Sequence, residues 1–150
     1  MSSISRCVLA AVFPCILLAG CKTEEVVGPE TTDAEIRLAN ISGWYLRHVR
    51  QYGRTPRSDA EFFAYVRNIP GSERVIPVEQ LDSYYISPRD KQHWVIRYSV
   101  PVEQAGESYA VPPGTVLMHE SVGLAGKKLI VRGNGFTELV NDATLAELTR

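Results

Sequence analysis

The feature that most restricts the fold is an uncharged N-terminal segment, Cys7 to Gly20, because it decides which residues are left to build a domain. One cation, Arg6, precedes the segment, and Pro14 interrupts it. A membrane-spanning helix needs roughly 20 apolar residues, so this shorter segment is typical of the apolar core of an export signal. The sequence therefore predicts that residues 1–20 are a signal peptide and that the fold lies beyond them.

The segment closes with small residues before a cysteine, in the order Leu17-Leu18-Ala19-Gly20-Cys21. This pattern resembles the lipobox of bacterial lipoproteins. The resemblance implies a single cleavage between Gly20 and Cys21, recognised through Leu18, Ala19 and Gly20, and lipidation of the thiol of Cys21. The alternative is an ordinary secreted protein in which this cysteine is incidental. Because two or three acyl chains hold a protein stably at a membrane, we expect a lipid-anchored protein of the bacterial cell envelope, facing the periplasm or the exterior.

Composition agrees with an anchored protein that has no thiol chemistry. Of the three cysteines, Cys7 and Cys15 lie in the predicted signal and Cys21 would be blocked as a thioether, so no disulfide is expected. The 16 basic residues less Arg6 leave 15, against 17 acidic residues. Such a nearly neutral chain lacks the positive excess typical of nucleic-acid-binding proteins, and no nucleic-acid partner is expected.

Residues 21–31 are predicted to form the lipidated cysteine and a flexible tether, because they show no sustained hydrophobic period and contain a Gly-Pro break. A capping box, Thr32-Asp33-Ala34-Glu35, then predicts a helix over about 33–52 that ends at Gly53. An apolar stripe with steps of three and four residues runs along this helix, through Leu38, Ile41, Tyr45, Val49 and Tyr52. A second capping box, Ser58-Asp59-Ala60-Glu61, predicts a shorter helix that stops before Pro70.

The rest of the chain has the patterns of strands and turns. Alternation of Trp94, Ile96 and Tyr98 predicts a strand over 93–99, and a Gly- and Pro-rich loop is expected over 101–114. Further strands are predicted over 115–120, 128–132 and 136–140, the last two joined by a hairpin turn at Gly133-Asn134-Gly135. Asn141 is expected to cap a final short helix. These elements predict a single α+β domain over 32–150, with two N-terminal helices packed on a small antiparallel sheet of about four strands and a short C-terminal helix.

Three segments carry a family resemblance: Gly53 to Pro56, Ser87 to Asp90, and Gly126 to Phe136. They resemble sequence blocks of small uncharacterised lipoproteins of the planctomycete type, whose tails are similar to the sheet-forming end of pseudopilin-like proteins. Asn134-Gly135 stands where those tails have an Asp-Gly turn, and a lipobox replaces the long assembly helix of pseudopilins. The resemblance implies an envelope lipoprotein and carries over no catalytic residue.

Candidate catalytic and metal-binding residues form no convincing pattern. His48, His93 and His119 lack the spacing of metal ligands, so we expect no metal and no cofactor. His119-Glu120-Ser121 places a base, an acid and a hydroxyl side by side, but neighbouring residues of a strand point to opposite faces. Asp90 and His93 flank a turn, where a structural hydrogen bond is the commoner role. No catalytic residue is predicted.

One local excess of charge suggests a docking face, formed by Arg47, Arg50, Arg54 and Arg57. The competing interpretation is a set of ordinary arginines at helix ends and on the surface. Two classes of function stay open. The first is a membrane-tethered, non-enzymatic structural or interaction module that contacts an envelope protein or a cell-wall component. The second is a small ligand-binding protein or hydrolase whose site is formed by loops 70–92 and 101–114, with Asp90, His93 or Glu120 converging on a cavity.

Overall fold

The computed structural model describes residues 28–70 and 80–150 of the chain. Cys21 and its predicted cleavage residues lie outside this part. Residues 71–79 of the predicted loop 70–92 also lie outside it. The elements follow in the order α1 (Pro29–Tyr52), α2 (Asp59–Arg67), α3 (Leu81–Tyr84), β1 (Val95–Ile96), β2 (Glu103–Ala105), β3 (Ser108–Ala110), β4 (Val116–His119), β5 (Lys128–Arg132), β6 (Thr137–Val140) and α4 (Asp142–Leu148).

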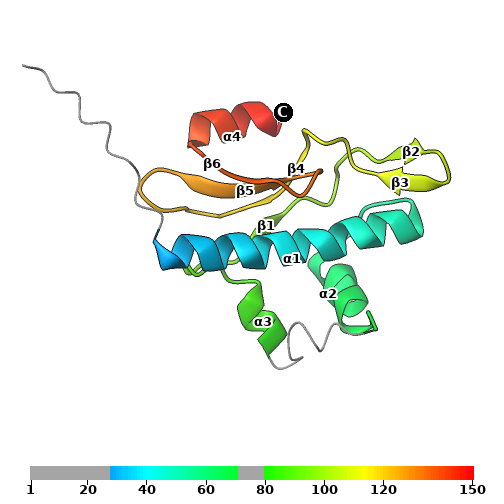
Figure 1. The fold of residues 1–150 in the computed structure, drawn as a ribbon, viewed down its shortest axis with the longest axis horizontal. Coiled ribbons are helices and arrows are strands. Elements are labelled where there is room, and N and C mark those ends of the chain that lie inside the picture. Colours follow the sequence, from blue (N-terminus) through cyan, green and yellow to red (C-terminus); the bar gives the residue numbers. More distant parts are fainter. Residues whose placement is uncertain (1–27, 71–79) are drawn as a thin grey trace, which may run out of the picture.

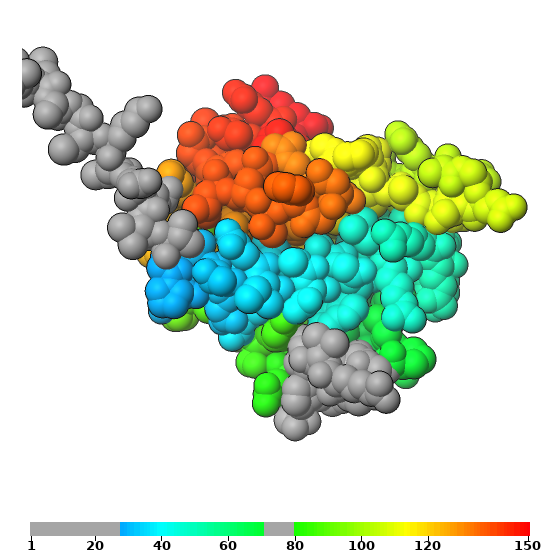
Figure 2. All heavy atoms as spheres, in the orientation of Figure 1, coloured from blue at the N-terminus to red at the C-terminus, as the bar shows by residue number. Residues whose placement is uncertain are grey.

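A four-stranded antiparallel sheet in the order β1-β4-β5-β6 lies between helices (Figure 1). α1 crosses one face of the sheet and α4 covers the other, while α2 and α3 lie beyond α1. β2 and β3 form a separate hairpin beside the C-terminal end of α1, at the far end of the molecule from the start of that helix (Figure 2). The mixed helix and sheet architecture is as predicted. The prediction that both N-terminal helices pack on the sheet is wrong, because α2 packs on α1 instead.

The sheet buries apolar side chains on both faces. Leu129 and Val131 of β5 share one cluster with Leu38 of α1, whereas Ile130 between them shares a second cluster with Leu145 of α4. Because successive residues of a strand point to opposite faces, a single short apolar strand supplies both clusters.

α1 begins at Pro29 and not at Asp33 as predicted. Gly28 is the cap residue, and no side-chain hydrogen bond caps the helix. Proline suits the first helical position because its φ is already helical and it has no N–H to leave unpaired, and the carboxylate of Glu30 favours the positive end of the helix. Residues 29–31, which were predicted to belong to the tether, therefore lie in the first turn of α1.

The apolar stripe predicted for α1 is buried except for its last member. Tyr52 is 51% exposed. The C-terminus is as predicted: Gly53 adopts the left-handed conformation, with φ of 66°, and its N–H donates to the carbonyl of Val49. The other members of the stripe are fully buried, namely Leu38, Ile41, Tyr45 and Val49.

Two predicted helix caps are confirmed. Ser58 Oγ accepts from the Glu61 N–H at 3.3 Å, and Asn141 Oδ1 accepts from the Thr144 N–H at 2.8 Å. The second half of the capping box at α2 takes another form, because the Glu61 carboxylate accepts from the Arg57 N–H at 2.7 Å. The Glu61 carboxylate therefore binds the backbone of the link between α1 and α2.

The strands differ from the prediction mainly at β1 and in the 101–114 segment. β5 has its predicted bounds, whereas β1 is reduced to two residues, although Trp94 is buried and Val95 exposed in the predicted alternation. The prediction of a plain loop over 101–114 is wrong, since it contains the β2–β3 hairpin. Every residue of these two strands is exposed, so they lack the hydrophobic alternation by which a half-buried strand is predicted.

Candidate functional site

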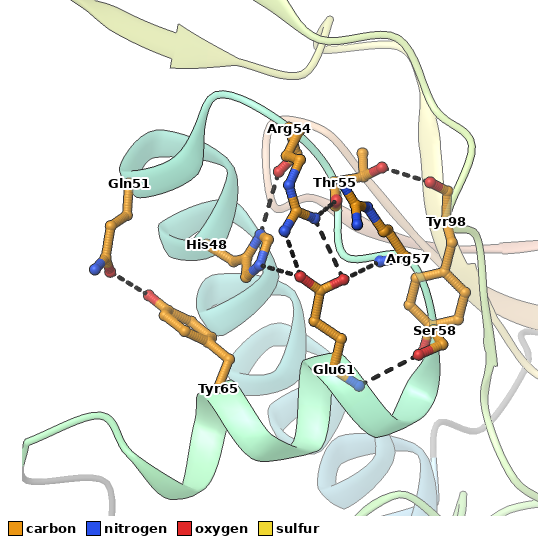
Figure 3. A network of polar contacts seen from close by, with 9 residues as sticks. All are labelled: His48, Gln51, Arg54, Thr55, Arg57, Ser58, Glu61, Tyr65 and Tyr98. Atoms are coloured by element: carbon orange, nitrogen blue, oxygen red, sulfur yellow. Dashed lines mark hydrogen bonds and ion pairs between the residues drawn. The ribbon is translucent and has the colours of Figure 1, made fainter.

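The best-defined polar cluster of the described chain lies where the link after α1 enters α2 (Figure 3). His48 of α1 is buried, and its Nδ1 lies 3.2 Å from the carbonyl oxygen of Arg54. Because a carbonyl only accepts, Nδ1 carries a proton, and Nε2 lies 3.9 Å from Glu61 Oε1. Burial is the main cause that lowers the pKa of His48, and it outweighs the opposite effects of the Arg54 carbonyl and the Glu61 carboxylate. The imidazole is therefore held neutral.

Glu61 is the centre of this cluster. Both oxygens of its carboxylate accept from the guanidinium of Arg54, and one also accepts from the Arg57 N–H. The hydrogen bond from Arg54, followed by that from Arg57, lowers the pKa of Glu61 to about 2. Thr55 Oγ1 in addition donates to the Tyr98 carbonyl, close to β1. These contacts fix the 53–57 link onto α2 and onto the chain beside the sheet.

Aromatic side chains pack against His48 at one edge of this cluster. The ring centroids of His48 and Tyr52 are 4.7 Å apart, those of His48 and Tyr65 4.9 Å, and those of Tyr52 and Tyr65 5.8 Å. Tyr65 also donates through its hydroxyl to Gln51 Oε1 at 3.2 Å. The two tyrosines, one from each helix, are thus held in place by ring contacts and by a polar contact.

Two hollows lie next to the tyrosine pair, and both are lined by Tyr52, Tyr65 and Asn68. The first, of about 310 Å³, is completed by residues of the polar cluster, including Glu61. The second, of about 190 Å³, is completed by Arg47, Gln51 and the residues that follow α2. We refer to the exposed surface formed by Arg47, Arg50, Gln51, Tyr52, Tyr65 and Asn68 as the α1–α2 face.

The four arginines of the predicted docking face differ in what they can do. Arg47 is exposed and lines the smaller hollow, and Arg50 is exposed in the last turn of α1. Arg57 is exposed on the link. Arg54, in contrast, is paired with Glu61 and also donates to the carbonyl of Thr55 at 2.9 Å. Its guanidinium therefore has a structural role, and the cations presented to solvent are those of Arg47, Arg50 and Arg57.

Glu120, which directly follows β4, belongs to a second polar cluster, which is buried. Its Oε1 accepts from Ser87 Oγ at 2.7 Å, and its Oε2 accepts from Arg89 at 2.7 Å and from the Leu129 N–H at 2.9 Å. The carboxylate is fully buried, and the Arg89 side chain is 3% exposed. With all of these bonds made, Glu120 fastens the 87–89 turn to β5 and faces no cavity among those described above.

The other candidate residues also make structural contacts. Asp90 accepts from the N–H groups of Gln92, Val122 and Gly123. His119 donates from Nδ1 to the Glu120 carbonyl at 2.8 Å, and burial is the main cause that lowers its pKa. His93 is exposed and pairs through its backbone with Ile86. Asp90, His93 and Glu120 therefore do not converge on a shared hollow in the described chain.

The two loops predicted to form a common site lie apart. Among described residues, Lys91 pairs with Glu30 in the first turn of α1, whereas Tyr109 of the β2–β3 hairpin lies against Gly53 at the other end of that helix. Residues 101–114 contribute to a hollow of about 450 Å³, but its partners are the ends of β1 and α4. The predicted juxtaposition of the two loops is not found in the part that the structure describes.

Within residues 28–70 and 80–150, no group of three or more His, Cys, Asp or Glu side chains is arranged to hold a metal ion. Among the helices of this same part, none combines the length and apolar character needed to cross a membrane. No family model, no curated protein and no solved structure matches the chain.

Sequence reasoning missed the tyrosine pair and the buried ion pair. Tyr52 was assigned to the core stripe of α1, although its position next to the terminal Gly53 is a signal that a helix is leaving the core. Tyr65 follows two phenylalanines and gave no separate signal. Arg89 and Glu120 are 31 positions apart, and no local pattern relates them.

Proposed function

We propose that the protein is a membrane-tethered envelope lipoprotein that works as a non-enzymatic interaction module, with the α1–α2 face as its docking surface. The tether is supported by the sequence Leu18-Ala19-Gly20-Cys21 and by the resemblance to small bacterial lipoproteins. The docking surface is supported by the geometry of helices α1 and α2. Neither part of the proposal requires a cofactor.

The observation that carries the docking surface is the tyrosine pair between two hollows, of which Tyr52 is 51% exposed and Tyr65 is partly buried. Tyr52 and Tyr65 are held by ring contacts to the buried His48, so little side-chain freedom is lost when a partner covers them. Tyrosine and arginine are the residue types most enriched at the energetic centres of protein interfaces. Arg47 lines the hollow beside the tyrosines, and Arg50 lies near it on α1. A surface with tyrosines, arginines and hollows is better suited to bind a protein partner than a flat surface that carries charge alone.

The exposed charge indicates the chemistry of that partner. Arg47, Arg50 and Arg57 have exposed side chains, and the nearest carboxylate of the cluster, Glu61, is already occupied by Arg54. Guanidinium groups pair with the carboxylates of an acidic protein, often through two parallel hydrogen bonds. We therefore infer an acidic protein of the envelope as the partner.

In-cell crosslinking tests this proposal. A photo-crosslinking residue in place of the exposed Gln51 of the full-length protein is expected to capture a protein partner. The double replacement Arg47→Glu and Arg50→Glu is expected to reduce the captured amount at least about tenfold, which corresponds to ~1.4 kcal/mol. Arg54 is left intact in this variant because its ion pair supports the fold.

Arg150→Glu is the matched control, since this exposed arginine follows α4 on the other side of the sheet (Figure 1). It is expected to leave capture unchanged. Equal capture by the wild type and by the double variant would retire the docking surface. An adduct that contains cell-wall polymer and no protein would contradict the inferred partner class.

A further inference from the structure

The loop between β4 and β5, residues 120–127, exposes two apolar side chains that are separated by one residue. Val122 is 67% exposed and Leu124 is 48% exposed. Single exposed apolar residues are ordinary on a protein surface, but two on one protruding loop need an explanation. Another strongly exposed apolar residue, Phe136 at 72%, lies at the opposite end of β5, in the β5–β6 turn.

Hydrogen bonds fix the backbone of this loop. Asp90 Oδ2 accepts from the N–H groups of Val122 and Gly123, both at 2.9 Å. The backbones of Leu124 and Lys127 form two reciprocal N–H to carbonyl hydrogen bonds, of 2.9 and 3.0 Å. The two residues between them, Ala125 and Gly126, have positive φ angles of 53° and 73°. These angles are those of a type I′ turn. A Cβ added to Gly123 would lie 2.3 Å from the Lys127 carbonyl oxygen, so the loop closes tightly beneath the two apolar side chains.

The loop lies at the end of the molecule where α1 begins (Figure 1). Lys91 Nζ lies 3.6 Å from Glu30 Oε1, which connects the 87–91 turn with the first turn of α1. Asp90 in that same turn holds Val122 and Gly123. We call Val122 and Leu124, with the backbone that presents them, the β4–β5 apex.

The length of chain between Cys21 and α1 limits how far this end of the domain can lie from the anchoring residue. Between Cys21 and Gly28 the chain can span at most about 25 Å, since an extended residue covers ~3.3–3.6 Å. If Cys21 carries acyl chains, the end of the domain that holds Gly28 and the apex is therefore kept close to the bilayer. The apex is then an exposed apolar surface at the end of the domain that is held near lipid.

We propose that the β4–β5 apex contacts the bilayer to which the protein is anchored, with Val122 and Leu124 at the boundary between headgroups and acyl chains. This inference rests on the proposed function, because it needs acylation at Cys21. Apolar side chains of interfacial proteins enter this boundary by ~5–10 Å. α1, of 24 residues and about 36 Å in length, then runs away from the apex and carries the α1–α2 face toward its far end.

Spin-label accessibility on the acylated protein tests the contact. Leu124→Cys supplies a single labelling site, because Cys7 and Cys15 are expected to leave with the signal and Cys21 to be blocked. In vesicles of phosphatidylethanolamine and phosphatidylglycerol, the label at residue 124 is expected to lose collisions with a water-soluble nickel chelate and to gain collisions with oxygen. A label introduced by Val122→Cys is expected to behave in the same way.

Phe136→Cys is the matched control, because it replaces an apolar residue at the other end of β5 that is at least as exposed as Val122 and Leu124. Its label is expected to stay fully accessible to the nickel chelate. If the labels at residues 122 and 124 are as accessible as that at 136 while mass spectrometry shows intact acyl chains, the apex inference is overturned and the anchored module stands. If no acyl chain is found on Cys21, the inference and the proposed tether are both overturned.

Discussion

Replacing Arg89 by alanine is expected to lower the free energy of unfolding by about 3–5 kcal/mol, because it leaves a buried carboxylate without its counter-charge. Glu120 is fully buried, and its Oε2 lies 2.7 Å from the guanidinium of Arg89. The backbone N–H of Leu129 and the hydroxyl of Ser87 would still donate to that carboxylate, but neither neutralises it. Urea unfolding followed by circular dichroism measures the loss.

Arg132→Ala is the matched control for this ion pair. Arg132 pairs with Glu138 on the surface, where the two side chains are 24% and 42% exposed. Solvent-exposed pairs contribute about 1 kcal/mol or less, so a much smaller loss of stability is expected. An Arg89→Ala variant no less stable than Arg132→Ala would contradict the structural role assigned to Glu120.

Replacing Phe62 by alanine is expected to cost about 3–5 kcal/mol of stability, through lost burial and the cavity that remains. Phe62 of α2 is fully buried, and its ring centroid lies 5.8 Å from that of Tyr45 in α1 and 6.2 Å from that of Tyr85. The substitution removes a fully buried apolar contact between α2 and α1. Thermal unfolding should show the loss, and crosslinking from residue 51 should fall with it.

Phe136→Ala serves as the comparison, because the same side chain is removed from a position that is 72% exposed. Surface substitutions of this kind change stability by about 0.5 kcal/mol or less. Similar effects of the two substitutions would show that α2 is not seated through Phe62, and would remove the support for the α1–α2 face.

The elements with local chemical signals could be predicted from the sequence. Ser58 and Asn141 cap helices because a side-chain oxygen reaches an N–H within the same turn, which is a relation of nearest neighbours. β5 is a short apolar run ended by a turn, and it has its predicted bounds. The start of α1 could not be predicted correctly, since a capping box at Thr32 competed with a proline at the first helical position.

The arrangement of the elements depends on contacts that no local pattern encodes. The apolar faces of α2 and α1 could meet each other or the sheet, and the sequence does not distinguish these outcomes. In the structure α2 lies on α1, and Phe62 packs against a ring from α1 and a ring from the segment after α3. The candidate site shows the same division: the arginines of α1 could be found in the sequence, whereas the capture of Arg54 by Glu61 required the fold.

The proposed anchor would orient the two proposed surfaces relative to the bilayer. A lipidated Cys21 would hold the start of α1 and the β4–β5 apex at the bilayer, and α1 would carry the α1–α2 face away from it. A partner in the aqueous part of the envelope could then reach Tyr52 and Arg47 while the protein stays on its membrane. In this proposal, the orientation of both surfaces relative to the bilayer depends on the acylation of Cys21.

Metabolic labelling with a radioactive fatty acid in the native host tests this central claim most directly. The wild-type protein and a Cys15→Ala control are expected to incorporate the label and to be found in the membrane fraction at the mass of a chain that begins at Cys21. Cys21→Ala is expected to incorporate no label and to accumulate at the mass of the uncleaved precursor. A Cys21→Ala protein that is processed and carries the fatty acid would contradict the account.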